Sequence, residues 1–137
     1  MLEPDRIRQI VRDAYVARQS GDKDALAKHF APGATFRLAG DTSRLGNFPA
    51  GPADAVETVA ALVAAVTFAA LEPAQIVVDG QQAAIRYAVH AALVPSGHAF
   101  ETEIADFLTF DDEGRITQLV EFADTGAIAH MAATGLL

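Results

Sequence analysis

Residues 103–125, EIADFLTFDDEGRITQLVEFADT, contain two strand-like runs on either side of the turn residues Asp111-Asp112-Glu113-Gly114. Apolar and polar side chains alternate along both runs, as is typical of strands with one buried face. Acidic residues followed by glycine favour a tight hairpin turn because they tolerate its backbone angles. The stretch therefore predicts an antiparallel hairpin, with strands at residues 98–110 and 115–123.

Two more strands are predicted before this hairpin, at residues 67–79 and 82–94. The turn residues Asp79-Gly80 separate them, and Pro95-Ser96-Gly97 separates the second from the hairpin. Consecutive strands joined by tight turns pair with one another, so the four form an antiparallel sheet.

The N-terminal half of the chain is predicted to be mainly helical. Apolar residues at three- and four-residue spacing predict an amphipathic helix from Pro4 to about Gln19, with Arg8, Arg12, Asp13 and Arg18 on its polar face. Further along we expect a short helix capped by Asp22 and ending at residues 31–33, a strand at 34–38, a loop at 40–52, a helix at 54–65 and, in the tail at 125–137, a short helix capped by Asp124 or Thr125. Three helices should cover one face of the sheet.

The length and composition fit one domain over residues 1–137 and exclude several kinds of partner. The net charge of −8 disfavours nucleic acid and anionic membrane surfaces. The chain has no cysteine, and its four histidines are not at metal-ligand spacing, so we expect neither a metal nor another cofactor.

The expected location is cytoplasmic. The N-terminus, MLEPDRIRQIV, lacks the apolar run of a signal peptide. The longest apolar stretch, residues 60–71, is too short to span a bilayer.

Two stretches resemble a known family. Residues 21–38, GDKDALAKHFAPGATFRL, and residues 103–125 are similar to SnoaL-like and ketosteroid isomerase-like proteins of the nuclear transport factor 2-like superfamily. The resemblance implies an α+β fold, a cone-shaped cystatin-like roll in which three helices pack on a curved, mostly antiparallel sheet around one apolar pocket. It does not fix the function, because this scaffold hosts isomerases, cyclases, hydrolases and non-catalytic binders.

The resemblance places two candidate oxyanion donors. Asp106 matches the protonated aspartic acid of the ketosteroid isomerases and shares a strand face with Ile104 and Leu108, where an ionised carboxylate is poorly solvated. Tyr15 matches the tyrosine donor of the first helix. The alternative interpretation is that both are core residues whose polar atoms are bonded internally.

The general base of the isomerases is missing. Leu38 occupies the position of their first-strand carboxylate, and Phe30 and Val59 replace two supporting tyrosines, so standard ketosteroid isomerase activity is not expected. Asp124 is a candidate acid or base at the pocket mouth, or else simply the helix N-cap. The catalytic triad of the limonene-type epoxide hydrolases is absent, because Tyr87 and Val89 stand at its Arg-x-Asp positions.

The predicted pocket is mostly apolar, as is usual for a site that binds a small hydrophobic molecule. Its expected lining is Tyr15, Phe30, Phe36, Leu38, Val59, Tyr87, Val89, Asp106 and Leu108. Arg86 and His90 then lie on the opposite sheet face, which commonly forms a homodimer interface in this superfamily.

Two classes of function remain open. One is an enzyme that acts on a small hydrophobic carbonyl-bearing metabolite, as an isomerase, cyclase or other lyase that stabilises an oxyanion. The other is a non-catalytic protein that binds a small ligand or serves only to dimerise; the apolar tail, residues 127–137, suits the dimerisation role.

Overall fold

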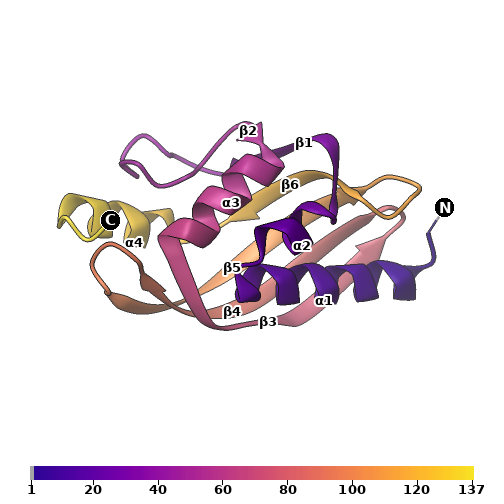
Figure 1. Cartoon of the computed structure of the whole chain (residues 1–137), viewed down its shortest axis with the longest axis horizontal. Helices are drawn as coiled ribbons and strands as arrows, with labels where there is room; N and C mark the ends of the chain where they lie inside the picture. Colours follow the sequence, from indigo (N-terminus) through magenta and orange to yellow (C-terminus); the bar gives the residue numbers. More distant parts are fainter. Residues whose placement is uncertain (1) are drawn as a thin grey trace.

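The computed structural model describes residues 2–137. Helices and a curved, mostly antiparallel sheet form an α+β fold, which confirms the expected architecture (Figure 1). The elements, in chain order, are α1 (Pro4–Ser20), α2 (Lys23–Ala27), β1 (Phe30–Leu38), β2 (Ala53–Asp54), α3 (Ala55–Ala65), β3 (Val66–Asp79), β4 (Gln82–Leu93), β5 (Ala99–Phe110), β6 (Ile116–Phe122) and α4 (Thr125–Ala133).

The sheet has the strand order β2-β1-β6-β5-β4-β3. Strands β3 to β6 form consecutive antiparallel pairs, as their turn residues predict, and their bounds lie within one residue of the predicted ones. β1 pairs with β6 in parallel, which the hairpin turns alone do not predict. Helices α1, α2 and α3 lie over one face of the sheet, and α4 lies at one end of it (Figure 1).

The boundary between α2 and β1 differs from the prediction. The helix ends at Ala27 and the strand already begins at Phe30, although Pro32 and Gly33 suggested a break between them. The reason is the partner strand: Phe30 is paired with Ile116, whose backbone N–H donates to the carbonyl oxygen of His29 at 2.8 Å. A register shift between Phe30 and Thr35 accommodates the irregular residues within the strand.

Arg18 was placed on the polar face of α1, and this prediction is wrong. Its side chain is 5% exposed. The residue lies seven positions after the buried Val11 and three after the buried Tyr15, so it continues their stripe on the inner face of the helix. The core therefore contains the guanidinium group of an α1 residue.

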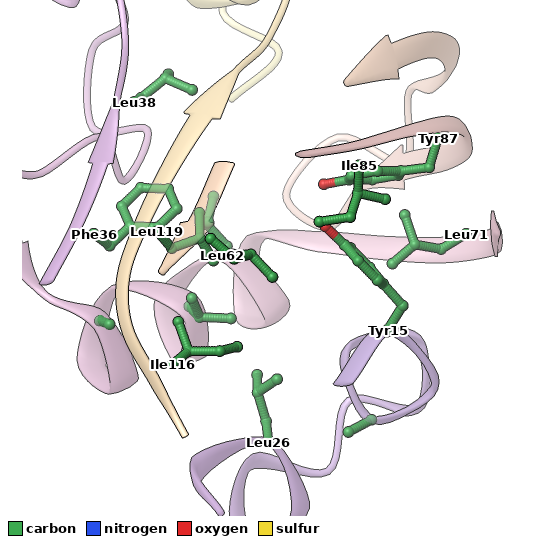
Figure 2. Close-up of a cluster of buried hydrophobic side chains, with 14 of the residues drawn as sticks. Tyr15, Leu26, Phe36, Leu38, Leu62, Leu71, Ile85, Tyr87, Ile116 and Leu119 are labelled. Carbon is green, nitrogen blue, oxygen red and sulfur yellow. The ribbon is translucent and has the colours of Figure 1, made fainter. Parts of the chain in front are cut away.

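The core lies between this helical layer and the sheet. Figure 2 shows Tyr15 of α1 and Tyr87 of β4 reaching into the same region of the core, next to Ile85. The two tyrosine rings pack with their centroids 4.7 Å apart. In residues 2–137, no helix is long and apolar enough to cross a membrane.

Candidate functional site

Five buried polar side chains meet inside the core. They come from one helix and three adjacent strands: Tyr15 and Arg18 of α1, Tyr87 of β4, Asp106 of β5 and Glu121 of β6. Tyr15 and Arg18 share a face because they are one helical turn apart. Asp106 and Glu121 are directly opposed partners on neighbouring strands, so their side chains leave the sheet on the same face.

Asp106 is the innermost member of this polar cluster and has no solvent-exposed surface. Its Oδ2 atom accepts hydrogen bonds from the hydroxyl groups of Tyr15 and Tyr87, the latter at 3.1 Å. The nearest cationic atom is Nη1 of Arg18, 3.6 Å from the same oxygen. The other carboxyl oxygen, Oδ1, is buried and has no partner among residues 2–137.

Glu121 holds the closer ion pair with Arg18. Nη1 of Arg18 donates to Oε1 of Glu121 at 2.9 Å and to the hydroxyl oxygen of Tyr87 at 3.0 Å. The Tyr87 hydroxyl also lies 3.1 Å from Oε1 of Glu121. Because a hydroxyl has one proton, Tyr87 donates to only one of the two carboxyl groups at a time, and it links them.

The two carboxyl groups are affected in opposite directions. Burial raises the pKa of Asp106 well above its ordinary value, and the charge of Glu121 raises it further, against the opposing effect of Arg18. Burial would also raise the pKa of Glu121, but the nearby Arg18 guanidinium outweighs it and holds that pKa below its usual value. Of the two carboxyl groups, the neutral form is thus favoured at Asp106 and the ionised form at Glu121.

The tyrosines and the arginine keep their protons. Burial raises the pKa of both Tyr15 and Tyr87 well above the ordinary value. For Arg18, burial acts to lower the pKa, but the carboxylate of Glu121 and its other neighbours more than compensate. Arg18 and Glu121 form the closer ion pair of the cluster.

A cavity of about 240 Å³ opens beside Arg18 and Glu121. Most of its walls are apolar, including Leu62 of α3, Phe68 of β3 and Met131 of α4. The guanidinium of Arg18 lies over the ring of Phe68, 5.6 Å from its centroid. The rim carries His98, Glu101, Asp124 and His130. The result is an apolar cavity with one ion pair in its wall.

The predicted pocket residues divide into three groups. Val89 lines the cavity of about 240 Å³, which is called the larger cavity below. Five others surround a separate void of about 20 Å³ behind Arg18: Tyr15, Phe30, Val59, Asp106 and Leu108. The remaining three, Phe36, Leu38 and Tyr87, are buried in the core and line neither space. Tyr15 and Asp106 thus lie one layer behind the larger cavity, and Arg18 borders both spaces.

Asp124 has both features that the sequence suggested for it. Its Oδ1 atom accepts from the backbone N–H of Ala127 at 2.9 Å, which makes it the N-cap of α4. The residue also lines the rim of the larger cavity.

Sequence reasoning missed the two charged members of the cluster, Arg18 and Glu121. A signal existed for each. Arg18 continues the helical stripe of Val11 and Tyr15, and Glu121 alternates with the buried Leu119 on the inner face of β6. In the described part of the chain, no three His, Cys, Asp or Glu side chains form a group that could hold a metal ion.

The outer face of the sheet carries paired charges and exposed apolar side chains. Arg86 pairs with Glu103 at 2.8 Å, and Nδ1 of His90 lies 3.1 Å from Glu101. Val77, Phe107 and Phe122 are each about half exposed. The Phe107 and Phe122 rings pack edge to face, 5.5 Å apart.

Several solved structures share this fold. An NTF2-like protein of unknown function from Burkholderia pseudomallei K96243 is 16% identical, with a TM-score of 0.74 over 92% of this chain and 96% of that one. SalBIII, an epoxide hydrolase/cyclase-like enzyme in pyran ring formation in the polyether salinomycin, is 25% identical, with a TM-score of 0.72 over 92% of this chain and 96% of that one. TerC, co-crystallised with polyporic acid, is 14% identical, with a TM-score of 0.72 over 93% and 98% of the two chains.

No curated protein matches the sequence. A family model, that of the SnoaL-like domain, matches residues 11–119, which contain four of the five clustered side chains and most of the sheet. By this match the chain belongs to the SnoaL-like domain family.

Proposed function

We propose that this protein is an enzyme that binds a small, mostly apolar, carbonyl-bearing molecule in the larger cavity and stabilises negative charge on its oxygen. The reaction class is that of an isomerase, cyclase or other lyase. The observation that carries the proposal is the position of Arg18, a buried cation in the wall of an otherwise apolar cavity.

The charges of the cluster favour a neutral ligand. Arg18 and Glu121 already balance each other, so an anionic ligand would add an uncompensated charge to a site that water hardly reaches. A carbonyl oxygen enters without charge and can accept a hydrogen bond from Arg18. This bond strengthens as the oxygen becomes an enolate, which is the condition for catalysis by oxyanion stabilisation.

Tyr15 and Asp106 support this site from behind in the proposed arrangement. Tyr15 donates to Asp106, and Asp106 lies on the far side of Arg18 from the larger cavity. The hydroxyl oxygen of Tyr87 and the carboxylate of Glu121 accept from the guanidinium and hold it in position, and a neutral Asp106 leaves the charge of Arg18 to be balanced by Glu121. Asp124 lines the rim of the cavity and is exposed to solvent.

The likeness to SalBIII supports a reaction of the ring-forming class, since that neighbour is described as epoxide hydrolase/cyclase-like. A non-catalytic binder is the second candidate. The identity of Leu38 favours a non-catalytic binder, because this buried apolar residue occupies the position at which the ketosteroid isomerases have their general base.

The binding part of the proposal is tested with 2-naphthol, an aromatic analogue of an enol, and with 2-methylnaphthalene, which has the same shape but no oxygen. Fluorescence titration should show that the wild-type protein binds 2-naphthol more tightly. Arg18→Met should reduce the affinity for 2-naphthol by about tenfold or more and change that for 2-methylnaphthalene little, since a hydrogen bond from a charged donor is lost.

The controls separate this effect from misfolding. Arg86→Met removes an exposed arginine of the outer face and should bind both ligands as the wild type does. Arg18→Lys keeps the positive charge and should recover part of the affinity for 2-naphthol. Equal affinity of the wild type for the two ligands would refute an oxygen-binding site.

We also propose that the protein is a homodimer through the outer face of the sheet. Val77, Phe107 and Phe122 expose apolar surface there, and the ion pairs of Arg86 and His90 lie on the same face. Exposed apolar side chains gathered on one face favour burial against a partner.

A further inference from the structure

We propose that Glu121 is the proton acceptor of this site and takes the role for which β1 provides no carboxylate. The inference rests on the proposed function and adds to it the residue that moves the proton. Asp106, the neutral partner of Glu121, is a positioning residue in this account.

The geometry favours Glu121 over every other carboxyl group near the cavity. Glu121 lines the larger cavity beside Arg18, so one bound molecule can contact both. Its Oε1 atom accepts from Arg18 and is in contact with the Tyr87 hydroxyl. Because both of these contacts are made to Oε1, Oε2 is the oxygen that receives the proton in this proposal.

The groups around Glu121 explain why it carries the charge. It contacts Arg18 from α1 and Tyr87 from β4, and Asp106 from β5 is its directly opposed strand partner. Tyr15 from α1 donates to Asp106. A single cation cannot balance two buried carboxylates, so the pair retains one proton. Arg18 is 2.9 Å from Glu121 and 3.6 Å from Asp106, which leaves the proton on Asp106.

Among residues 2–137, the other charged or titratable side chains that line this cavity are at its rim, namely His98, Glu101, Asp124 and His130. The side chain of Glu101 is 78% exposed and pairs with His90, and Asp124 caps α4. Neither adjoins the guanidinium that would hold the developing oxyanion.

The proposed step conserves charge within the site. A C–H bond next to the carbonyl group breaks, its proton passes to Oε2 of Glu121, and the electron pair moves onto the carbonyl oxygen to form an enolate that faces Arg18. The anion moves from Glu121 to the ligand, and no further charge is buried. Return of the proton to another carbon gives an isomer. Attack of the enolate on a second carbonyl group closes a ring, and the new alkoxide takes the proton back from Glu121.

The test uses 2-tetralone, whose enol resembles 2-naphthol in shape. In D₂O, proton NMR follows the exchange of its acidic C1 hydrogens for deuterium. The wild-type protein should accelerate this exchange, and Glu121→Gln should lower the protein-dependent rate by about a hundredfold or more, as expected for loss of a general base. The same variant should bind 2-naphthol within a few-fold of wild type.

Two further variants distinguish catalysis from structure. Glu103→Gln, on the outer face, should exchange at the wild-type rate. Asp106→Asn keeps a neutral group with an acceptor for the tyrosines and should lower the rate by much less than Glu121→Gln. The wild-type rate should also fall in acid as Glu121 becomes protonated.

The outcomes separate the two proposals. Tight 2-naphthol binding without accelerated exchange would overturn the role of Glu121 and leave the binding site intact. Exchange that survives in Glu121→Gln, or that is lost more in Asp106→Asn, would also overturn it. Failure of the wild type to bind 2-naphthol would refute the proposed function and this inference with it.

Discussion

Asp106 and Glu121 are two carboxyl groups on directly opposed strand positions, yet the pKa of Asp106 is raised and that of Glu121 is lowered. Both are buried, so the difference comes from the side of the pair on which Arg18 lies. The hydrogen-bonded guanidinium lowers the pKa of Glu121, whereas at the longer distance of 3.6 Å it does not outweigh the effect of burial on the pKa of Asp106. One arginine thus has different effects on two adjacent acids.

The raised pKa of Asp106 has a consequence for stability. Between the unfolded and the folded pKa, the folded chain retains a proton that the unfolded chain has lost, so stability falls as pH rises. In the Asp106→Asn variant the side chain at this position is neutral at every pH, so it causes no such fall in stability. When both proteins are studied by calorimetry, the melting temperature of the Asp106→Asn variant minus that of the wild type should therefore increase from pH 4 to pH 7.

The exposed Asp5 provides the control for this trend, since Asp5→Asn should show no comparable increase. A difference between Asp106→Asn and wild type that stays constant, or that decreases with pH, would contradict a neutral Asp106.

The sequence predicted Asp106 and Tyr15 correctly as inward-facing but did not predict their surroundings. Strand alternation places Asp106 on the buried face. The depth of the cavity and the approach of Arg18 depend on how α1 crosses the sheet, which no local pattern encodes. The predicted site therefore included Tyr15, Tyr87 and Asp106 but neither Arg18 nor Glu121.

At the scale of elements, periodicity and turn residues were sufficient for most of the chain. Helices α1 and α3 and strands β3 to β6 have nearly the predicted bounds, because each has a clear period and a clear cap or turn. The start of β1 was missed because its pairing with β6 is a long-range contact that outweighs the local Pro-Gly signal. The parallel arrangement of that pair likewise requires the tertiary fold.

The carboxyl group of Asp124 contacts the first turn of α4. Asp124→Ser keeps a capping oxygen and should leave the unfolding free energy nearly unchanged in urea denaturation, whereas Asp124→Ala should lower it by about 1 kcal/mol. If the 2-tetralone exchange rate of Asp124→Ser equals that of wild type, capping is its role. A loss of exchange in a stable Asp124→Ser protein would assign it the acid or base role instead.

In the whole molecule, the two faces of the sheet carry different kinds of surface. The inner face, with α1 and α3, encloses the cluster and the cavity, and the outer face exposes Val77, Phe107 and Phe122. The family membership and the α+β fold followed from the two sequence stretches that resemble this family, and both are confirmed.

The proposed dimer makes a prediction about mass. The chain has a mass of 14.4 kDa, so light scattering of the wild type should give twice that value. Phe107→Glu buries a charge in the proposed interface and should give a monomer. Val16→Glu, at an exposed position on α1, should remain a dimer. A monomeric wild type at micromolar concentration would reject the interface.

A carbon-13 NMR titration of the side-chain carboxyl groups tests the protonation states of Asp106 and Glu121, with Asp106→Asn and Glu121→Gln used to assign the two signals. We expect the Asp106 signal to stay at its protonated position at neutral pH, where the Glu121 signal is that of an ionised carboxylate. An Asp106 that ionises like an ordinary aspartate, or a Glu121 that remains protonated at neutral pH, would contradict the account.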